Sequence, residues 1–518
     1  METFRTIGDM LRHNAELYAE RPAFVFQGRC YSFAEVNERV NRLSHALMRL
    51  GLVKGDRVGI LAYNCPQYFE VFGLAKAGLV CVPLNYRLSA EEVAYLVEDC
   101  ELSALIAESE LAAQVEPIRE RLRCVRYFVC LDGKAAGWLD YEELLTSSTG
   151  QEPGVSVSGE DPAALFYTSG TTGQPKGALH THQSILAESS VPHRELGPSE
   201  VALCVMPFFH VGGSTAYLFP AFYFGATTVI LRKFDPALAL QTIEKERVTN
   251  TCVVPIMLRR LLEHPELGRR DLSSLRTIVY TGAPMPQETI RKGLERFGPI
   301  FVQALGQTEG QLLSVLDKEG HRLGMRERPE LLESAGRPYY PGEIKLVDEH
   351  DQEVPPGQVG EIVSCSGRIM REYWKQPEET ARVMRGGWLH TGDLARQDQE
   401  GYIYLVDRAK DMIVSGGENI YSREVELVLE SHPAVLEAAV IGVPDEEWGE
   451  AVKAIVVLRE GAKATEEELI EYCKKRLASY KKPRTVEFWD SLPKNPSGKV
   501  LKREIREKYW AALERRVH

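Results

Sequence analysis

Short apolar runs alternate with amphipathic helical segments through roughly the first 280 residues, and this alternation limits the possible folds more than any other feature. Each run is only two to five residues long, as expected for strands buried in a sheet. The runs are Val58–Ala62, Leu105–Ile106, Tyr127–Leu131, Thr227–Leu231 and Thr277–Tyr280. Strands separated by helices predict an α/β fold with largely parallel sheets.

The helices between these runs have recognisable starts. Ser32 with Glu35 forms a predicted capping box, and apolar residues follow it at spacings of four and three up to Leu50. Ser89 with Glu92 is a second predicted box, which opens a helix toward Leu96.

Composition places the chain among ordinary globular proteins. At 518 residues, with 44% apolar and 26% charged residues, it is long enough for two to four domains. The net charge of −12 argues against a nucleic-acid partner. The ten cysteines include no Cys-x-x-Cys pair, which predicts reduced, mostly buried thiols and a cytoplasmic protein.

One stretch requires a membrane check. Residues 201–231 contain no Asp, Glu, Lys or Arg, but prolines and glycines interrupt them. A strand, a loop and a short buried helix explain this stretch better than a membrane span. The first residues also lack the profile of a signal peptide, so we expect no integral membrane segment.

The sequence pattern changes from alternating helices and strands to short strands after Gly336. Short strand patterns with Gly-rich turns predict a small β-barrel or sheet over about residues 336–406. Beyond Asp407 the pattern is helix (422–431), strands (436–443 and 452–458) and helix (465–478), followed by a basic run. We therefore expect a large domain of stacked α/β subdomains over 1–406 and a smaller mobile α+β domain over 407–518.

The segment Tyr167–Gly177 is the strongest chemical signal. It contains three glycines, four serine or threonine residues and the cation Lys176, directly after an apolar strand pattern. Small side chains let backbone N–H groups converge on a phosphate. The spacing is not that of a Walker A loop. Taken alone, the segment could equally be a solvated turn.

Three later segments add to this loop. Gln303–Glu309 ends in Gly-x-Thr-Glu, Thr391–Asp393 is a Thr-Gly-Asp turn, and Pro493–Val500 carries Lys499 in a Pro/Gly-rich loop. Individually they are typical of a helix cap, an Asx-turn and a solvated lysine. Together, and in this order, they resemble the acyl-adenylate-forming ligases, the superfamily of acyl-CoA synthetases, firefly luciferase and peptide-synthetase adenylation domains. The resemblance covers about residues 8–510.

The resemblance implies an ATP site and a magnesium ligand. Glu309 would hold Mg²⁺, Thr308 would touch the α-phosphate, and Asp393 with Arg408 would bind the ribose. Catalysis would depend on Lys499, Thr308, Glu309 and Lys176. The implied ATP-binding residues are Thr168, Ser169, Gly170, Thr171, Thr172, Gly173, Lys176, Gly282, Ala283, Pro284, Gln303, Ala304, Leu305, Gly306, Thr308, Asp393, Arg408 and Lys499. In one departure, Leu305 occupies a position that is commonly aromatic in the family.

The resemblance also implies a second half-reaction with coenzyme A. The C-terminal domain would swing about Lys410, withdrawing Lys499 and lining a tunnel for the pantetheine arm. The implied coenzyme A contacts are Ser415, Gly416, Gly417, Glu418 and Trp448. The basic run Lys474–Arg484 is a further candidate, although a solvated surface explains most of it.

The acyl pocket would include His210, Val211, Gly212, Gly213 and Ser214. Residues 208–210 are Phe-Phe-His, without the carboxylate that amino-acid adenylation domains use for the α-ammonium, which disfavours an amino-acid substrate. We therefore expect an acyl-CoA synthetase that acts on a fatty or an aromatic or alicyclic acid. The alternatives are a luciferase-like oxygenase, an amino-acid or aryl-acid adenylation enzyme and a non-catalytic nucleotide-binding relative. A homodimer is left open.

Overall fold

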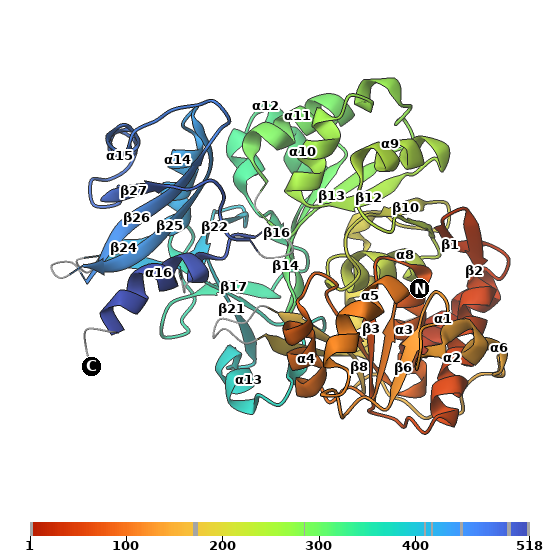
Figure 1. Cartoon of the computed structure of the whole chain (residues 1–518). Coiled ribbons are helices and arrows are strands. Elements are labelled where there is room, and N and C mark those ends of the chain that lie inside the picture. Colours follow the sequence, from red (N-terminus) through yellow and green to blue (C-terminus); the bar gives the residue numbers. More distant parts are fainter. Residues whose placement is uncertain are drawn as a thin grey trace. The chain divides into compact units, whose positions relative to one another are not determined.

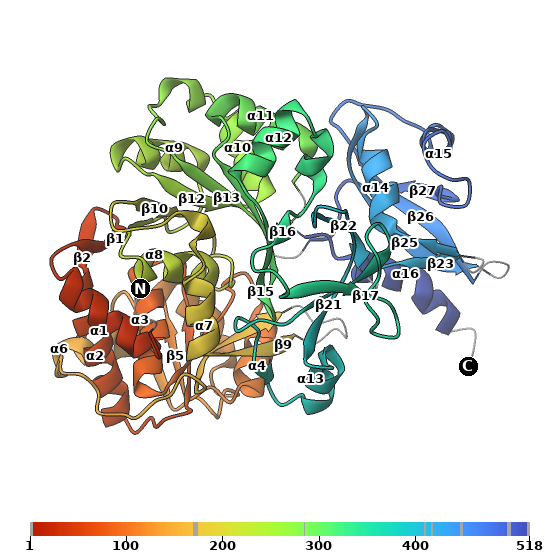
Figure 2. The same ribbon diagram turned by 180° about the vertical axis from the view of Figure 1, so that it is seen from behind.

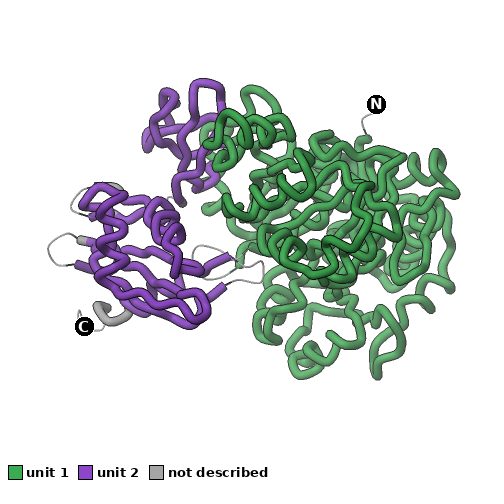
Figure 3. Tube along the Cα trace, turned by 90° about the horizontal axis from the view of Figure 1, so that it is seen from above, with its two compact units in different colours: residues 1–344, 364–389 green, residues 345–363, 390–518 purple. Residues whose placement is uncertain are grey.

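The computed structural model describes residues 4–168, 175–283, 285–408, 411–415, 418–445, 449–494 and 499–514. The chain divides into two compact units, one of residues 1–344 with 364–389 and one of residues 345–363 with 390–518 (Figure 3). The boundary between a large and a small domain that the sequence predicts at residues 406/407 stays a prediction.

The first unit contains a nine-stranded sheet. The strands from β1 and β11 through β10, β12 and β13 to β14 are parallel neighbours, and β2, β15 and β16 are antiparallel additions at the edges. In spatial order the strands are β16 (Arg337–Pro338), β15 (Gln311–Leu316), β14 (Phe301–Gln307), β13 (Thr277–Tyr280), β12 (Asn250–Val253), β10 (Val201–Cys204), β11 (Thr227–Ile230), β1 (Pro22–Phe26) and β2 (Arg29–Ser32).

The same unit contains an eight-stranded sheet. It is parallel from β8 through β4, β3, β5 and β6 to β7, whereas β9 and β19 run antiparallel to their neighbours. The order is β19 (Glu372–Tyr373), β9 (Lys176–Thr181), β8 (Pro162–Thr168), β4 (Val80–Pro83), β3 (Arg57–Leu61), β5 (Ala104–Ala107), β6 (Tyr127–Cys130) and β7 (Leu139–Asp140). The predicted parallel α/β class is confirmed.

Helices connect and cover these strands. In both views α10, α11 and α12 lie beside the β12–β14 part of the larger sheet (Figure 1 and Figure 2). The helices of this unit are α1 (Ile7–Leu17), α2 (Phe33–Arg49), α3 (Pro66–Gly73), α4 (Ala90–Asp99), α5 (Ser109–Val115), α6 (Tyr141–Thr146), α7 (His182–Ser189), α8 (Phe219–Tyr223), α9 (Pro236–Lys245), α10 (Pro255–Glu263), α11 (Gln287–Phe297), α12 (Lys318–Arg326) and α13 (Pro377–Val383). A π-helix spans Ser214–Leu218, and 3₁₀ turns span Leu74–Ala77, Glu116–Ile118, Pro192–Arg194, Leu267–Arg269 and Pro329–Glu333.

An aromatic core joins the two sheets. Phe69 of α3 and Phe222 of α8 lie with ring centroids 4.5 Å apart, and Phe72 meets Phe219 at 5.4 Å. Phe24 of β1 packs on Phe69, and Phe72 stacks on a phenylalanine of β8. The core therefore fixes the larger sheet against the smaller one through α3 and α8.

The uncharged stretch 201–231 belongs to this core. It forms β10, the π-helix, α8 and β11, in agreement with the predicted strand, loop and short helix. Among the described residues, no helix has both the length and the apolar sequence needed to cross a bilayer. All ten cysteines are free thiols, and seven of them are buried, as predicted.

The remaining strands form two smaller sheets. The first contains β17 (Ile344–Val347), β18 (Val359–Ser364), β21 (Trp388–Gln397) and β20 (Met384–Arg385), with β22 (Ile403–Arg408) paired to β21. The second contains β24 (Glu418–Ile420), β23 (Ile413–Ser415), β26 (Gly449–Leu458) and β25 (Val435–Asp445), with β27 (Thr485–Phe488) paired to β26. Three helices accompany the second sheet: α14 (Ser422–Glu430), α15 (Glu466–Lys474) and α16 (Lys502–Glu514).

Candidate active site

The predicted phosphate-binding loop connects two paired strands. β8 and β9 are antiparallel neighbours, and their register places Thr168 opposite Lys176. Both ends of the loop are thereby fixed to the eight-stranded sheet. The loop residues Ser169, Gly170, Thr171, Thr172 and Gly173 lie outside the described residues.

Lys176 is almost fully buried at the start of β9. Its ammonium forms an ion pair with the carboxylate of Glu379 in α13 and lies 5.4 Å from the ring centroid of Tyr373. The hydroxyl of Tyr373 donates a hydrogen bond of 2.8 Å to Glu309, the predicted magnesium ligand. Tyr373 therefore lies between the two predicted charged groups of the site.

Sequence analysis does not single out Tyr373 or Glu379. Glu379 is 203 residues from Lys176, so no local spacing links the two side chains. They meet because β19 adds to the edge of the eight-stranded sheet, where its residues pair with Ala178 and Leu179 of β9. Long-range strand pairing of this kind is absent from local sequence patterns.

The Gly-x-Thr-Glu motif forms the turn between β14 and β15. Thr308 and Glu309 lie in that turn, directly after Gln303–Gln307 on β14, which include Ala304, Leu305 and Gly306. A Cβ atom at Gly306 would come within 2.5 Å of the Gln311 carbonyl oxygen, so glycine is required for the two strands to approach closely.

The predicted adenine-binding residues come from neighbouring strands. β13 and β14 are parallel, and Tyr280 pairs with Gln303. Gly282 and Ala283 follow β13, so they continue alongside the part of β14 that carries Leu305. Ligands in α/β sheets bind at the carboxyl ends of parallel strands, where these residues lie. Pro284 is outside the described residues.

His180 of β9 connects the two nucleotide motifs. Its Nε2 donates to the backbone carbonyl of Thr308 at 2.8 Å, because a carbonyl oxygen can only accept. Its Nδ1 therefore accepts, with the Ser184 hydroxyl at 3.2 Å. Burial lowers the pKa of His180 to about 4, which keeps the imidazole neutral. The histidine therefore fixes the position of the Thr308 backbone and does not act as an acid or base.

A further hydrogen bond extends this connection toward the predicted acyl pocket. The Thr215 hydroxyl in the π-helix donates to Gln311 Oε1 at 2.9 Å, and Gln311 Nε2 lies 3.5 Å from His180 Nδ1. Gln311 has a positive φ of 54°, which is uncommon for a residue with a side chain. This backbone conformation directs Gln311 between the two segments.

The predicted acyl segment lies between β10 and the π-helix. The Nε2 atom of His210 is buried and has no hydrogen-bond partner among the described residues. Burial, with a smaller effect of Arg87, lowers the pKa of His210 to about 4. A neutral imidazole with an unsatisfied nitrogen suits a polar group of a bound ligand.

The two glycines of this segment have different neighbours. A Cβ atom at Gly213 would come within 2.3 Å of the Pro207 carbonyl oxygen, whereas one at Gly212 would meet only the flexible Met206 methyl group at 3.0 Å. Ser214 follows and donates to the His210 carbonyl at 2.7 Å, and Val211 accepts from the π-helix. Gly213 is thus required by the turn itself.

The predicted ribose contacts belong to the second unit. Asp393 lies within β21, not in a turn, and its register partner on β22 is Arg408. The Asp393 backbone N–H donates to the Thr391 hydroxyl at 3.1 Å, and that hydroxyl donates to the Ile362 carbonyl at 2.7 Å. The two residues that the resemblance assigns to ribose therefore face each other on adjacent strands.

The segment that carries Lys499 belongs to the same unit, and the described residues at its two ends contact each other. A β-bridge joins Lys494 to Val500, and the Leu501 N–H donates to the Pro493 carbonyl at 2.8 Å. Lys499 is exposed between these anchors. The contacts of residues 493 and 494 with residues 500 and 501 therefore fix the backbone next to Lys499.

The predicted coenzyme A and hinge residues are only partly described. Ser415 ends β23 and pairs with Glu418, which begins β24. Lys410, Gly416, Gly417 and Trp448 lie outside the described residues. In the basic run, Lys474, Lys475, Arg476 and Arg484 are exposed, whereas Lys481 is partly buried and pairs with Glu424 at 2.7 Å.

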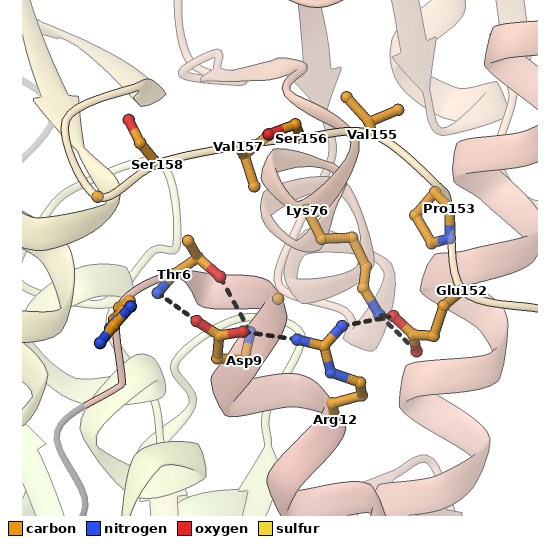
Figure 4. Close-up of a pocket in the computed structure, with 13 residues that line it drawn as sticks. Thr6, Asp9, Arg12, Lys76, Glu152, Pro153, Val155, Ser156, Val157 and Ser158 are labelled. Atoms are coloured by element: carbon orange, nitrogen blue, oxygen red, sulfur yellow. Dashed lines mark hydrogen bonds and ion pairs between the residues drawn. The ribbon is translucent and has the colours of Figure 1, made fainter.

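A separate cavity of about 420 Å³ lies between α1 and residues 152–159 (Figure 4). None of the predicted site residues lines it. Its charged groups bind one another: Lys76 pairs with Glu152 at 2.8 Å, and Arg12 with Asp9 at 2.5 Å. Four of its charged residues are thus paired with one another, and the cavity is separate from the predicted site.

Comparison with known proteins agrees with this arrangement. The model of the AMP-binding enzyme family matches residues 11–374, and that of the AMP-binding enzyme C-terminal domain matches residues 424–499. The chain is 40% identical to a feruloyl-CoA synthase of an Amycolatopsis species, with 93% of the chain and 94% of the relative covered. It is 37% identical to the fatty acid–[acyl-carrier-protein] ligase ScoC of Streptomyces coeruleorubidus, with 96% and 95% covered.

The fold also matches a solved structure. The amide bond synthetase McbA of Marinactinospora thermotolerans superposes with a TM-score of 0.87 at 32% identity, with 97% of this chain and 99% of that chain covered. The two family models include the segments that carry Lys176, Glu309 and Lys499, and Asp393 lies between the stretches that they match. The chain is a member of the AMP-binding enzyme family.

Proposed function

We propose that the protein is an ATP-dependent acid–thiol ligase. A carboxylate attacks the α-phosphorus of ATP to give an acyl-adenylate and pyrophosphate, and the coenzyme A thiol then displaces AMP to give acyl-CoA. The feruloyl-CoA synthase and fatty acid ligase relatives support a carboxylic acid substrate. The oxygenase, amino-acid adenylation and non-catalytic alternatives have no comparable support.

One observation carries the proposal. His180 follows the phosphate loop in sequence and binds the backbone of Thr308, 128 residues later, at 2.8 Å. Tyr373 joins the same two motifs from a third segment. Since three distant parts of the chain converge on Lys176 and Glu309, these motifs act as one site.

The proposed roles follow from the charges of these residues. Lys176 and the loop from Thr168 neutralise and orient the β- and γ-phosphates. Glu309 supplies a single carboxylate, which fits Mg²⁺, since this ion is commonly bound by one or two carboxylates together with substrate phosphates. When bound, Mg²⁺ would neutralise charge on the phosphate oxygens. Asp393 accepts both ribose hydroxyls, because a carboxylate can accept two hydrogen bonds at once.

Lys499 is the proposed catalytic lysine of adenylation. Its ammonium would bond the substrate carboxylate and the α-phosphate as charge develops. We also propose that residues 407–518 move as a domain about Lys410 and withdraw Lys499 before the thiol arrives. Ser415–Glu418 and Trp448 would then contact coenzyme A. A homodimer of this chain stays a prediction.

The acyl group is proposed to lie beside His210 and Gly212. The buried, unpartnered His210 Nε2 would meet a polar atom of the substrate. Residues 207–213 contain no carboxylate, which argues against an α-ammonium group on the acid. Fatty and aromatic acids are both compatible with this segment.

A half-reaction experiment tests the proposal. Lys499→Ala should slow adenylate formation by about a thousandfold, comparable to the loss of other groups that stabilise a transition state, yet leave thioester formation from preformed acyl-AMP within a few-fold of wild type. Pyrophosphate exchange measures the first step and acyl-CoA appearance the second, across fatty, cinnamic and alicyclic acids. Equal loss in both steps would contradict the assignment of Lys499, and no AMP release with any acid would contradict the proposed reaction.

A further inference from the structure

Glu379 occupies an unusual position for an acidic residue in a proposed polyphosphate site. It lies on the first turns of α13 and forms an ion pair with Lys176. The side chains of the two residues are 5% and 19% exposed, so water screens the pair far less than a surface pair. A carboxylate therefore holds the cation that the phosphates would need.

Glu379 also has a second cation. Arg382, one turn later, donates to its two oxygens at 2.9 and 2.6 Å. The pKa of Glu379 is lowered to about 2, first by Arg382 and further by Lys176, against the opposing effect of burial. Glu379 is thus ionised at any physiological pH and keeps a charge partner when Lys176 leaves.

The segment around Glu379 is fixed to the site at several points. The Tyr373 N–H donates to the Thr380 hydroxyl at 2.9 Å, which ties the start of α13 to β19. The Trp374 N–H donates to the Gly177 carbonyl at 2.7 Å, next to Lys176. The Glu379 carboxylate is therefore held at the Lys176 ammonium by the sheet edge.

We propose that Glu379 is an internal competitor for the polyphosphate of ATP, which holds Lys176 in the nucleotide-free protein and releases it to the bound phosphates. This inference rests on the proposed function of Lys176. When ATP binds, the Lys176 ammonium exchanges one anionic partner for another, and Glu379 keeps Arg382. After adenylation Glu379 recaptures Lys176, which favours departure of pyrophosphate. Nucleotide affinity is lowered so that the product can leave.

Binding measurements without an acid substrate test this proposal. Glu379→Gln removes the competing charge, so MgATP and magnesium pyrophosphate should bind about fivefold more tightly by titration calorimetry, the upper range of a partly exposed ion pair. Glu379→Ala should change affinity in the same direction, which guards against an effect peculiar to glutamine. The matched control is Glu378→Gln, an exposed neighbour on the same helix that loses the same charge, with an expected change below twofold.

Turnover supplies a second readout that a purely structural role would not give. In Glu379→Gln the KM for ATP and the inhibition constant of pyrophosphate should both fall about fivefold, although the melting temperature should fall below that of Glu378→Gln because the buried Lys176 loses its partner. Unchanged or weaker binding of both ligands in the Glu379 variants would overturn the inference.

Lys176→Gln separates this inference from the proposed function. It should weaken MgATP binding and remove most of the effect of a second Glu379→Gln substitution, because the two residues act as a pair. If Lys176→Gln weakens binding but Glu379→Gln has no effect, only the competitor role is wrong. If Lys176→Gln leaves MgATP affinity unchanged, the phosphate role of Lys176 is wrong and the inference fails with it.

Discussion

His180 shows at the residue scale how a buried neutral side chain can control a charged site. It touches no predicted substrate atom, yet it holds the Thr308 carbonyl from β9 and accepts hydrogen bonds from the opposite side. A buried carbonyl that loses its donor costs about 1–3 kcal/mol. The position of the Thr308–Glu309 turn therefore depends on this histidine.

We expect His180→Ala to lower kcat/KM for ATP about tenfold or more, since the turn that carries Thr308 loses its anchor. His182→Ala is the matched control: the ring of this neighbouring buried histidine accepts from the Ile7 N–H at 3.1 Å, on α1 and away from the β14–β15 turn in sequence. His182→Ala should lower the melting temperature without a selective effect on ATP. Equal kinetic losses in both variants would contradict the anchoring role.

Leu305 permits a second test at the residue scale. It is partly exposed on β14, beside the residues that follow β13. Leu305→Tyr would add a ring that can stack on adenine, so ATP should bind modestly more tightly, by about 0.5–1.5 kcal/mol, with turnover unchanged. Fluorescence titration with ATP measures this change, and weaker binding would place adenine elsewhere.

At the element scale, the turn between β10 and the π-helix requires glycine at position 213 but can accept a larger residue at position 212. Gly213→Ala would press a methyl group against the Pro207 carbonyl, where the backbone must shift. We expect a loss of at least about 2 kcal/mol in the free energy of unfolding, in the range of overpacked cores. Gly212→Ala should fold, because the Met206 methyl group can move, and should shift the acid preference toward smaller acyl groups.

Denaturant unfolding and an acid panel on both variants check this expectation. If Gly213→Ala is as stable as Gly212→Ala, the turn is less constrained than the structure indicates. If Gly212→Ala leaves the acid preference unchanged, this glycine does not line the acyl pocket.

Local chemistry explains which elements could be predicted. Ser89 and Glu92 form both bonds of the predicted capping box. At the other predicted box only one bond forms: Ser32 accepts from the Glu35 N–H, whereas the Glu35 carboxylate accepts from Arg29 instead. The helix predicted over 465–478 is shorter, because α15 ends at Lys474, where three successive cations favour a helix terminus.

The contacts of Lys176 could not be predicted in the same way. The loop was recognisable from its glycines and hydroxyls, but Tyr373 and Glu379 reach Lys176 only through pairing of β19 with β9. His180 is likewise an unremarkable residue of a buried strand until the β14–β15 turn folds against it. Sequence patterns report local periodicity and caps, whereas these contacts depend on which strands become neighbours.

At the scale of the whole molecule, five histidines, four of them buried and His210 partly buried, give the first unit a common response to acid. Burial is the leading cause in each case: it lowers the pKa of four of them to about 4 and lowers that of the fifth well below its usual value. They are His180, His182, His210, His321 and His193. In the unfolded chain these histidines take up protons as the pH falls through about 6.5, whereas in the folded unit the same imidazoles stay neutral at that pH.

Stability should therefore be complete above about pH 6.5 and fall as the pH drops toward 4, because the unfolded state takes up the protons. Near pH 5, unfolding should take up roughly four protons at these histidines. Calorimetry in buffers of different ionisation enthalpy measures that uptake. His321→Gln should reduce it by about one proton, whereas the exposed His350→Gln should not change it. A melting temperature that is constant from pH 7 to pH 5 would contradict this account.

The bridge between Lys494 and Val500 has a consequence for how the family can diversify. The pairing of these two residues fixes both ends of the segment that carries Lys499. An exchange of residues 493–501 for the equivalent stretch of a relative should therefore succeed where the relative also keeps the contacts of the two ends with the sheet, the ion pair of Lys494 with Glu437 and the packing of Val500 on β25 and β26. Relatives could in this way change the acceptor of the acyl group and keep the same adenylation lysine.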